Sequence, residues 1–278
     1  MNFKINVSRI CFYLCVLLLV LYSVGPLIWI LLTSLSPEQS FFDTPASIFN
    51  PKHLTFVNYF NLFKDTYFIN FLLNSFYITI GTTLIAILVA TLAAYSLTRF
   101  NYRGKNLFTI FSLFAYMIPT VLLVIPLYLF AVKARLTDKL SGLIFAYVAL
   151  CLPYSIWMIR AFFQSISIEF EEAAFIDGAG RLKVLFYIII PISMPGIIAA
   201  TVFIFSLVWN EYLFALVFMS SDLKMTFPIG LQSFITEHFT YWNYILSGSV
   251  IVCIPALIIF LATQKTLVKG WCAGGIKG

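Results

Sequence analysis

Charged residues are scarce in this chain of 278 residues. Only 10% of the residues are charged and 62% are hydrophobic, whereas a soluble domain normally carries about a quarter charged residues. The composition therefore indicates a membrane protein. The net charge of +6 comes from basic residues that are spread along the sequence, so no contiguous basic patch points to a nucleic-acid partner.

Histidine and cysteine are also few. The two histidines, His53 and His238, fall in expected outer loops with no second ligand nearby, so we expect no metal site and no haem attachment. Four cysteines lie in apolar runs and one lies near the C-terminus, so none is placed to bridge an outer loop. The cysteines are Cys11, Cys15, Cys151, Cys253 and Cys272.

No motif in the sequence indicates catalysis or a bound cofactor. Gly104-Lys105-Asn106 lacks the upstream glycine and the Ser/Thr of a phosphate-binding loop. Gly178-Ala179-Gly180 begins like a dinucleotide fingerprint, but Lys183 occupies the third glycine position and no strand precedes it. No cluster of His, Cys or carboxylate residues suggests a membrane enzyme. Any energy for work must come from a partner protein or from an ion gradient.

Six apolar runs are each long enough to cross a bilayer, which takes about 20 residues. They cover residues 10–32, 71–97, 107–132, 140–159, 197–219 and 244–263. No internal repeat and no segment large enough for a soluble domain accompanies them. The sequence predicts an all-α membrane protein with six transmembrane helices in one domain over residues 1–278.

The basic residues predict the orientation of the six spans. The side of the N-terminus would carry 11 of the 17 Lys and Arg residues, which favours two cytoplasmic termini. These residues are Lys4, Arg9, Arg99, Arg103, Lys105, Arg160, Arg181, Lys183, Lys265, Lys269 and Lys277. The first run resembles a signal peptide, but its apolar core is too long and no A-x-A site follows, so we expect it to be retained.

The longest predicted cytoplasmic segment, residues 160–195, contains a short polar helix, a glycine and a second helix. Three glutamates fall in the first turns of the first helix, where the helix dipole favours anions. Gly178 permits a left-handed turn and ends this helix. One interpretation is a surface on which another protein docks. The alternative is an amphipathic helix that lies on lipid, which the clustered glutamates disfavour because anionic headgroups would repel them.

The spacing of this segment carries a resemblance to a known family. Its pattern is E-A-A, three residues, G, nine residues and I-x-x-P, and it is similar to the signature loop of ABC-importer permeases; Ile190 stands where that family usually has Leu. The matching positions are Glu172, Ala173, Ala174, Gly178, Ile188 and Pro191. Other segments resemble the carbohydrate branch of the family: Leu73-Asn74-Ser75, Ala93 to Leu97, Arg103-Gly104-Lys105, Trp209 to Tyr212, Phe227 to Leu231, and the tail from Val268, in which Trp271 and Cys272 depart from the usual ending.

The resemblance implies a type I ABC importer permease fold in a prokaryotic plasma membrane. Such a chain is a non-catalytic permease subunit of a sugar importer. It forms a heterodimer with a second permease and works with two ATPase subunits, which bind the ATP and Mg, and with an extracytoplasmic substrate-binding protein. Contact with an ATPase is implied for Glu172, Ala173, Ala174, Gly178, Ala179 and Pro191, and for Gly274, Gly275 and Lys277 of the tail.

Two alternative functions stay open. Close relatives in the same importer class also carry glycerol phosphate or other polyols. An ion-coupled secondary carrier is a further alternative, but it predicts several intramembrane carboxylates or a repeat with broken helices. The apolar runs contain one carboxylate and no repeat.

Glu211 is that carboxylate, and groups of this kind are functional candidates by default. It could hold the helices together through Asn210, line a sugar pathway, or carry a proton. In a sugar pathway, Asn210 would line the path beside Glu211, and Trp209 or Tyr212 would stack on a pyranose face. Tyr116 and Tyr154, which lie near prolines, are weaker candidates for pathway lining.

Overall fold

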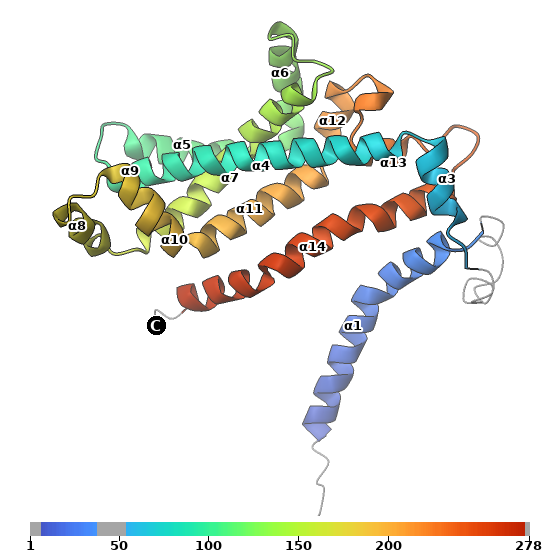
Figure 1. Cartoon of the computed structure of the whole chain (residues 1–278), viewed down its shortest axis with the longest axis horizontal. Coiled ribbons are helices and arrows are strands. Elements are labelled where there is room, and N and C mark those ends of the chain that lie inside the picture. The colour runs from blue at the N-terminus through green and yellow to red at the C-terminus, as the bar shows by residue number, and fades with distance from the viewer. Residues whose placement is uncertain (1–6, 38–53, 276–278) are drawn as a thin grey trace, which may run out of the picture. The chain divides into compact units, whose positions relative to one another are not determined.

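The computed structural model describes residues 7–37 and 54–275 (Figure 1). Every named element in these residues is a helix, and the one β-bridge, between Ile235 and Thr240, is isolated. The all-α prediction is therefore confirmed for this part of the chain.

Four helices are long and apolar enough to cross a membrane. They are α1 (Val7–Ser34), α4 (Phe68–Arg99), α7 (Leu140–Gln164) and α14 (Trp242–Gly275). Two further spans exist only as bent helix pairs, α5 with α6 and residues 181–192 with α11. The predicted number of six spans is reached if each bent pair crosses once.

The predicted span 107–132 is bent and is not one continuous helix. It is divided into α5 (Lys105–Met117) and α6 (Thr120–Lys133), which meet at 104°. The break falls at Pro119, which has no N–H to donate and forces Ile118 into extended backbone. Pro126 lies inside α6 without ending it.

The predicted span 197–219 is also interrupted. It begins earlier, as α11 (Met194–Trp209), and the helix stops before Asn210. A second short helix, α12 (Leu213–Phe218), then follows. Glu211 lies in the irregular turn between these two helices and forms its hydrogen bonds there.

The contacts divide the chain into two compact units. One comprises residues 1–68 and 231–254, in which α3 (Val57–Asp65) packs on the end of α1. There Asn58 Nδ2 donates to the carbonyls of Ser34 and Ser36 at 2.9 and 2.8 Å, and the hydroxyls of Ser34 and Tyr59 lie 2.6 Å apart. These bonds hold the α1–α3 junction.

The other unit comprises residues 69–230 and 255–278 and contains two apolar cores. Helices α4, α7 and α11 run beside one another in it (Figure 1). The first core is centred on Tyr147, Cys151, Ile204, Phe214 and Phe218. The second contains Tyr95, Ile159, Phe163, Val184 and Ile189, and it supports the predicted docking segment.

The described residues also form several short helices. They are α8 (Glu169–Ile176), α9 (Arg181–Val184), the π-helix η3 (Leu185–Ile189), α10 (Ile190–Ile192), the 3-10 helix η4 (Asp222–Lys224) and α13 (Phe227–Gln232). The wide π turn ends two residues before Pro191, whose ring cannot fit above a normal α-helical turn.

Candidate functional site

The predicted docking segment forms a helical hairpin at one end of its unit, where α8 and α9 meet (Figure 1). Gly178 ends α8 with φ +81°. Its N–H donates to Phe175 O at 3.0 Å, and the N–H of Ala179 donates to Ala174 O at 2.9 Å. This bond pair is a Schellman motif, which satisfies the last carbonyls of the helix. The predicted left-handed turn at Gly178 is confirmed.

The role of Gly178 is conformational and not steric. A Cβ atom built there meets nothing within 4 Å, but φ +81° is a conformation that L side chains rarely adopt. Gly180, two residues later, has φ −77° and equally open surroundings. Substitutions at the two glycines can therefore distinguish the effect of backbone conformation from the effect of steric crowding.

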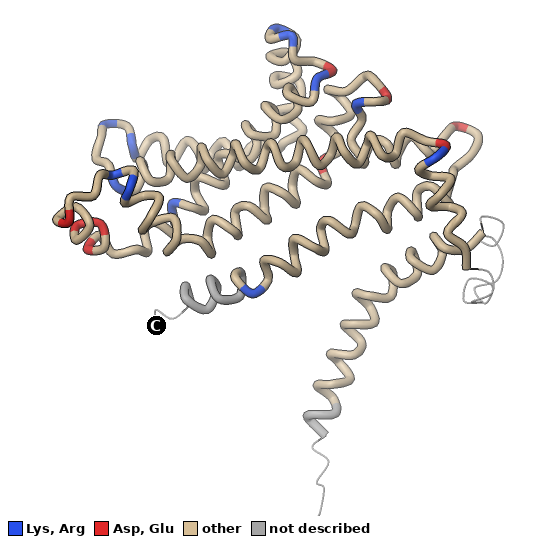
Figure 2. Tube along the Cα trace, viewed as in Figure 1, with Lys and Arg blue, Asp and Glu red and all other residues tan. Residues whose placement is uncertain are grey.

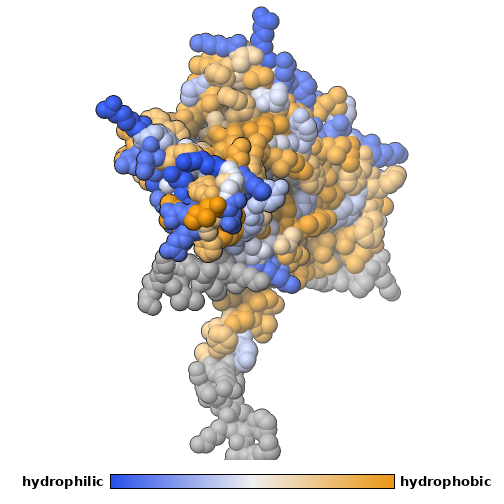
Figure 3. All heavy atoms as spheres, turned by 60° about the vertical axis from the view of Figure 1, so that its left-hand side comes forward, coloured by the Kyte–Doolittle hydropathy of each residue, from blue (hydrophilic) through white to orange (hydrophobic). Residues whose placement is uncertain are grey.

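One face of α8 is open to the surroundings. Glu169, Glu172, Ala173 and Ile176 are all exposed and follow the i, i+3, i+4, i+7 spacing of a single helix face. The Ile176 side chain is 87% exposed. Figure 2 shows acidic residues gathered on α8, and Figure 3 shows that apolar side chains lie among hydrophilic ones at this end of the unit. We call Glu172, Ala173 and Ile176 the docking face.

The opposite face of α8 is anchored by an ion pair that sequence reasoning did not find. Glu171 is only 2% exposed and pairs with Arg99 in the last turn of α4. The Tyr95 hydroxyl donates to the same carboxylate at 3.1 Å. Arg99 also donates to Ile166 O at 3.1 Å, just before α8. Helical periodicity would have placed Glu171 and Glu172 on different faces of the helix. It could not have identified Arg99 as the partner of Glu171.

The second arm of the hairpin packs on the core. Val184, Leu185 and Ile189 are buried, and the Arg181 guanidinium lies over the Phe100 ring at 4.7 Å from its centroid. Pro191 itself is exposed. The chain then bends by 78° before α11. The docking segment is therefore held to its unit on both arms.

The C-terminal tail is described only in part. Gly274 and Gly275 are the last two residues of α14. Lys277 lies outside the described residues. The predicted contact of this tail with an ATPase stays a prediction.

Glu211 caps α12 with its own side chain. Its carboxylate accepts the N–H of Phe214 at 2.9 Å and of Ala215 at 3.2 Å, and the Tyr147 hydroxyl at 2.5 Å. Both carboxylate oxygens are thus engaged, at a helix N-terminus where the dipole favours an anion. These bonds fit the structural alternative for Glu211, but its partners are Tyr147 and the start of α12 and not Asn210.

The other predicted pathway residues lie in different environments. Trp209 is 2% exposed and packs between the rings of Phe76, Phe205 and Phe227. Asn210 is exposed at the end of α11, and its side chain donates to Ser206 O in the last turn of that helix.

Two of the weaker candidates are brought together. The rings of Tyr116 and Tyr154 lie 4.9 Å apart, and Tyr154 also contacts Phe203 at 4.0 Å. Tyr212 is half-buried against the first core. Tyr116 and Asn210 are the most accessible of the predicted pathway residues.

Two segments that were singled out by resemblance, Leu73-Asn74-Ser75 and Phe227 to Leu231, meet at the other end of α4. Ser75 Oγ accepts the N–H of Phe227 at 2.8 Å, and Asn74 Nδ2 donates to the carbonyls of Leu223 and Met225. Gly230 leaves room for the Phe71 ring, which a Cβ atom would meet at 2.1 Å. The N-terminal end of α4 is therefore fixed to residues 223–230.

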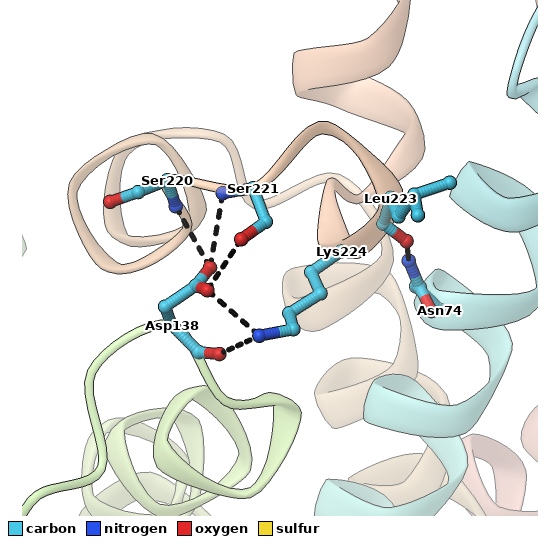
Figure 4. A network of polar contacts seen from close by, with 6 residues as sticks. All are labelled: Asn74, Asp138, Ser220, Ser221, Leu223 and Lys224. Atoms are coloured by element: carbon cyan, nitrogen blue, oxygen red, sulfur yellow. Dashed lines mark hydrogen bonds and ion pairs between the residues drawn. The ribbon is translucent and has the colours of Figure 1, made fainter.

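Hydrogen bonds and one ion pair join residues 220–227, which we call the 220–227 loop, to the α6–α7 connection (Figure 4). Lys224 Nζ donates to Asp138 Oδ2 at 2.8 Å and to its carbonyl at 2.7 Å. Ser221 and the N–H of Ser220 also donate to this carboxylate. These bonds hold Asp138 at φ +52°, and the neighbouring Lys224 ammonium holds the pKa of that carboxyl well below its usual range.

An apolar pocket of about 300 Å³ lies between α4, α10 and α11. Its ten lining residues include Thr83, Leu88 and Ile190 but none of the predicted pathway residues. Among the side chains that the structure describes, in residues 11–37 and 54–266, no group of three or more His, Cys, Asp or Glu is placed to hold a metal ion.

Comparison with known proteins identifies the family. Residues 83–269 match the binding-protein-dependent transport system inner membrane component family. The chain belongs to this family. It is thus a multi-pass membrane component of a transport system, as the docking-segment spacing predicted.

Several relatives of this family are similar over nearly their whole length. The inner membrane ABC transporter permease protein YcjP of Escherichia coli is 30% identical over 99% of both chains. The trehalose/maltose transport system permease protein MalG of Thermococcus litoralis is 33% identical over 98% of both. The sulfoquinovosyl glycerol permease SmoH of Agrobacterium fabrum is 35% identical over 91% of this chain and 88% of its own.

The fold is also found in a solved structure. A bacterial ABC transporter involved in the import of the acidic polysaccharide alginate contains a chain with a TM-score of 0.81 and 23% identity. The match covers 95% of this chain and 99% of that chain. The helical architecture is therefore that of an ABC importer permease.

Proposed function

We propose that this chain is the transmembrane permease subunit of an ATP-driven, binding-protein-dependent sugar importer in a prokaryotic plasma membrane. It forms half of the translocation pathway beside a second permease. Two ATPase subunits supply the energy, and an extracytoplasmic binding protein delivers the substrate. The observation that carries the proposal is the docking face of α8, an exposed apolar and acidic surface on a rigidly held hairpin.

The chemistry of the docking face suits insertion into another protein. Ile176 exposes apolar area that is favourable to bury, and Ala173 lets a partner surface approach closely. Glu172 supplies a charge that a basic ATPase residue would pair with. Glu169 and Glu172 on the same exposed face disfavour contact with anionic lipid.

In this proposal the hairpin converts ATPase motion into movement of the spans. Closure of the ATPase pair displaces α8, and the Schellman turn at Gly178 passes this displacement to the second arm. Because that arm packs on the second core through Val184 and Ile189, the attached helices move with it. The pathway then opens alternately to the two sides of the membrane.

We propose an uncharged sugar as the substrate. The names of MalG and of the Mycobacterium tuberculosis permease SugB assign trehalose or maltose to those proteins. The predicted spans contain no Lys or Arg to bind an anion, which disfavours glycerol phosphate; a neutral polyol is the second candidate.

Reconstitution tests the proposal. The chain would be placed in vesicles with the second permease, ATPase and binding protein from its gene neighbourhood, and uptake of a panel of labelled sugars would be measured. We expect uptake that requires ATP, the binding protein and the ATPase, and none with this chain alone. Accumulation by the chain alone, driven by a proton or sodium gradient, would contradict the proposal.

A further inference from the structure

The only charged side chains of α8 and α4 that meet are Glu171 and Arg99, among the residues the structure describes. They are 72 positions apart in the sequence. The chain itself connects α8 to α7 and, through α9, to α11. Only non-covalent contacts connect it to α4.

These contacts are concentrated in the buried ion pair. The side chains of Arg99 and Glu171 are 10% and 3% exposed, so water screens their attraction little. Arg99 bonds both α8, through Glu171, and the segment before α8, through Ile166 O. A planar guanidinium held at two points fixes orientation as well as distance. The remaining apolar contacts of α8 with the core come from Ala174 and the following Ala179, which are small.

The other end of α4 is anchored equally well. Asn74 and Ser75 form hydrogen bonds with residues 223–227, which lead into the first residue of α13. From Ser75 to Arg99 the helix is continuous and about 36 Å long at 1.5 Å per residue. That length exceeds the roughly 30 Å hydrocarbon core of a bilayer.

We infer that Arg99 and Glu171 are positioning residues that join α8 to α4, so that α4 carries displacement between the docking face and the 220–227 loop on the opposite side of the membrane. This inference rests on the proposed function. Through this connection, α4 would also transmit a signal from a docked binding protein to the ATPase.

Glu171→Gln tests the inference in the complete complex in vesicles, because it removes the charge while preserving the shape of the side chain. We expect the ATPase to remain bound and basal hydrolysis to persist. Stimulation of hydrolysis by sugar-loaded binding protein, and sugar uptake per ATP hydrolysed, should each fall about tenfold, within the usual range of coupling between sites. Arg103→Gln is the matched control, since Arg103 is exposed and makes no ion pair with a described residue.

A chemical link distinguishes positioning from simple stabilisation. In a chain whose native cysteines are replaced, Arg99→Cys and Glu171→Cys would be joined by a short thiol-specific cross-linker. We expect the unlinked double variant to be uncoupled and the cross-linked one to regain uptake per ATP. Full coupling of Glu171→Gln, or no recovery in a complex in which the cross-link has formed, would overturn the inference. Failure of the unaltered chain to bind the ATPase would instead refute the proposed function.

Discussion

The Tyr147 hydroxyl donates a hydrogen bond of 2.5 Å to the Glu211 carboxylate, which joins the first third of α7 to the break between α11 and α12. The two residues are 64 positions apart. Tyr147 is 1% exposed and belongs to the first core. An interrupted helix is thereby tied to a continuous one.

Removing either partner should lower stability without changing substrate affinity. Tyr147→Phe and Glu211→Gln should each cost about 1–3 kcal/mol, because a buried hydrogen-bonding group loses its partner. The double variant should cost less than the sum, since the two side chains share one interaction. Thermal unfolding of the purified chain measures the first effect, and the KM of uptake measures the second. A KM raised tenfold in Glu211→Gln, with unchanged unfolding temperature, would assign Glu211 to the sugar pathway.

Gly178→Val should uncouple transport while leaving the chain inserted in the membrane. A β-branched residue strongly disfavours φ +81°, so the Schellman turn would rearrange and misdirect the docking face. Gly180→Ala is the matched control and should behave as the unaltered chain, because φ −77° suits alanine and the space is open. ATPase activity stimulated by the binding protein is the measurement. Normal stimulation in Gly178→Val would refute the requirement for this turn.

Ile176→Glu should prevent the ATPase from binding and leave the fold intact. The Ile176 side chain is 87% exposed, so a charge there is solvated in the free chain, whereas burial in an interface would leave it unpaired. Co-purification of the ATPase with the permease is the measurement. Leu223→Glu adds the same charge at an exposed leucine of the 220–227 loop and should not affect co-purification. Equal loss of the ATPase in both variants would argue against a docking face on α8.

Asp138→Asn should lower the unfolding temperature at neutral pH but not in strong acid. The Lys224 ammonium lowers the pKa of Asp138 in the folded chain, so the ionised group stabilises the fold above its unfolded pKa of about 3.9. This stabilisation is lost as the pH falls through the lower folded pKa. The difference between the variant and the unaltered chain should therefore be constant from pH 8 to 6 and shrink below about pH 4.

Asp222→Asn is the control for this titration. Asp222 is exposed in the same loop and makes no ion pair with a described residue. Its unfolding temperature should follow that of the unaltered chain at every pH. A constant deficit of Asp138→Asn down to pH 2 would show that the Lys224 pair is not the source of the stabilisation.

Local features of this chain could be predicted because they depend on neighbouring residues. The apolar runs could be recognised because each of their side chains transfers favourably into lipid. The left-handed turn could be placed at Gly178 because only glycine adopts this conformation readily. The division of the run 107–132 was partly visible at Pro119, but the bend of 104° was not. A proline removes one hydrogen bond, and packing then decides the angle.

By itself, the sequence determined that the chain is an all-helical membrane protein with a polar hairpin, since composition and periodicity depend on each residue and its near neighbours. Only the tertiary structure decided that Glu171 turns inward to Arg99 while Glu172 stays exposed, and that Tyr147 reaches Glu211. These partners lie 72 and 64 positions apart. Their pairing depends on how the helices pack, which no local pattern specifies.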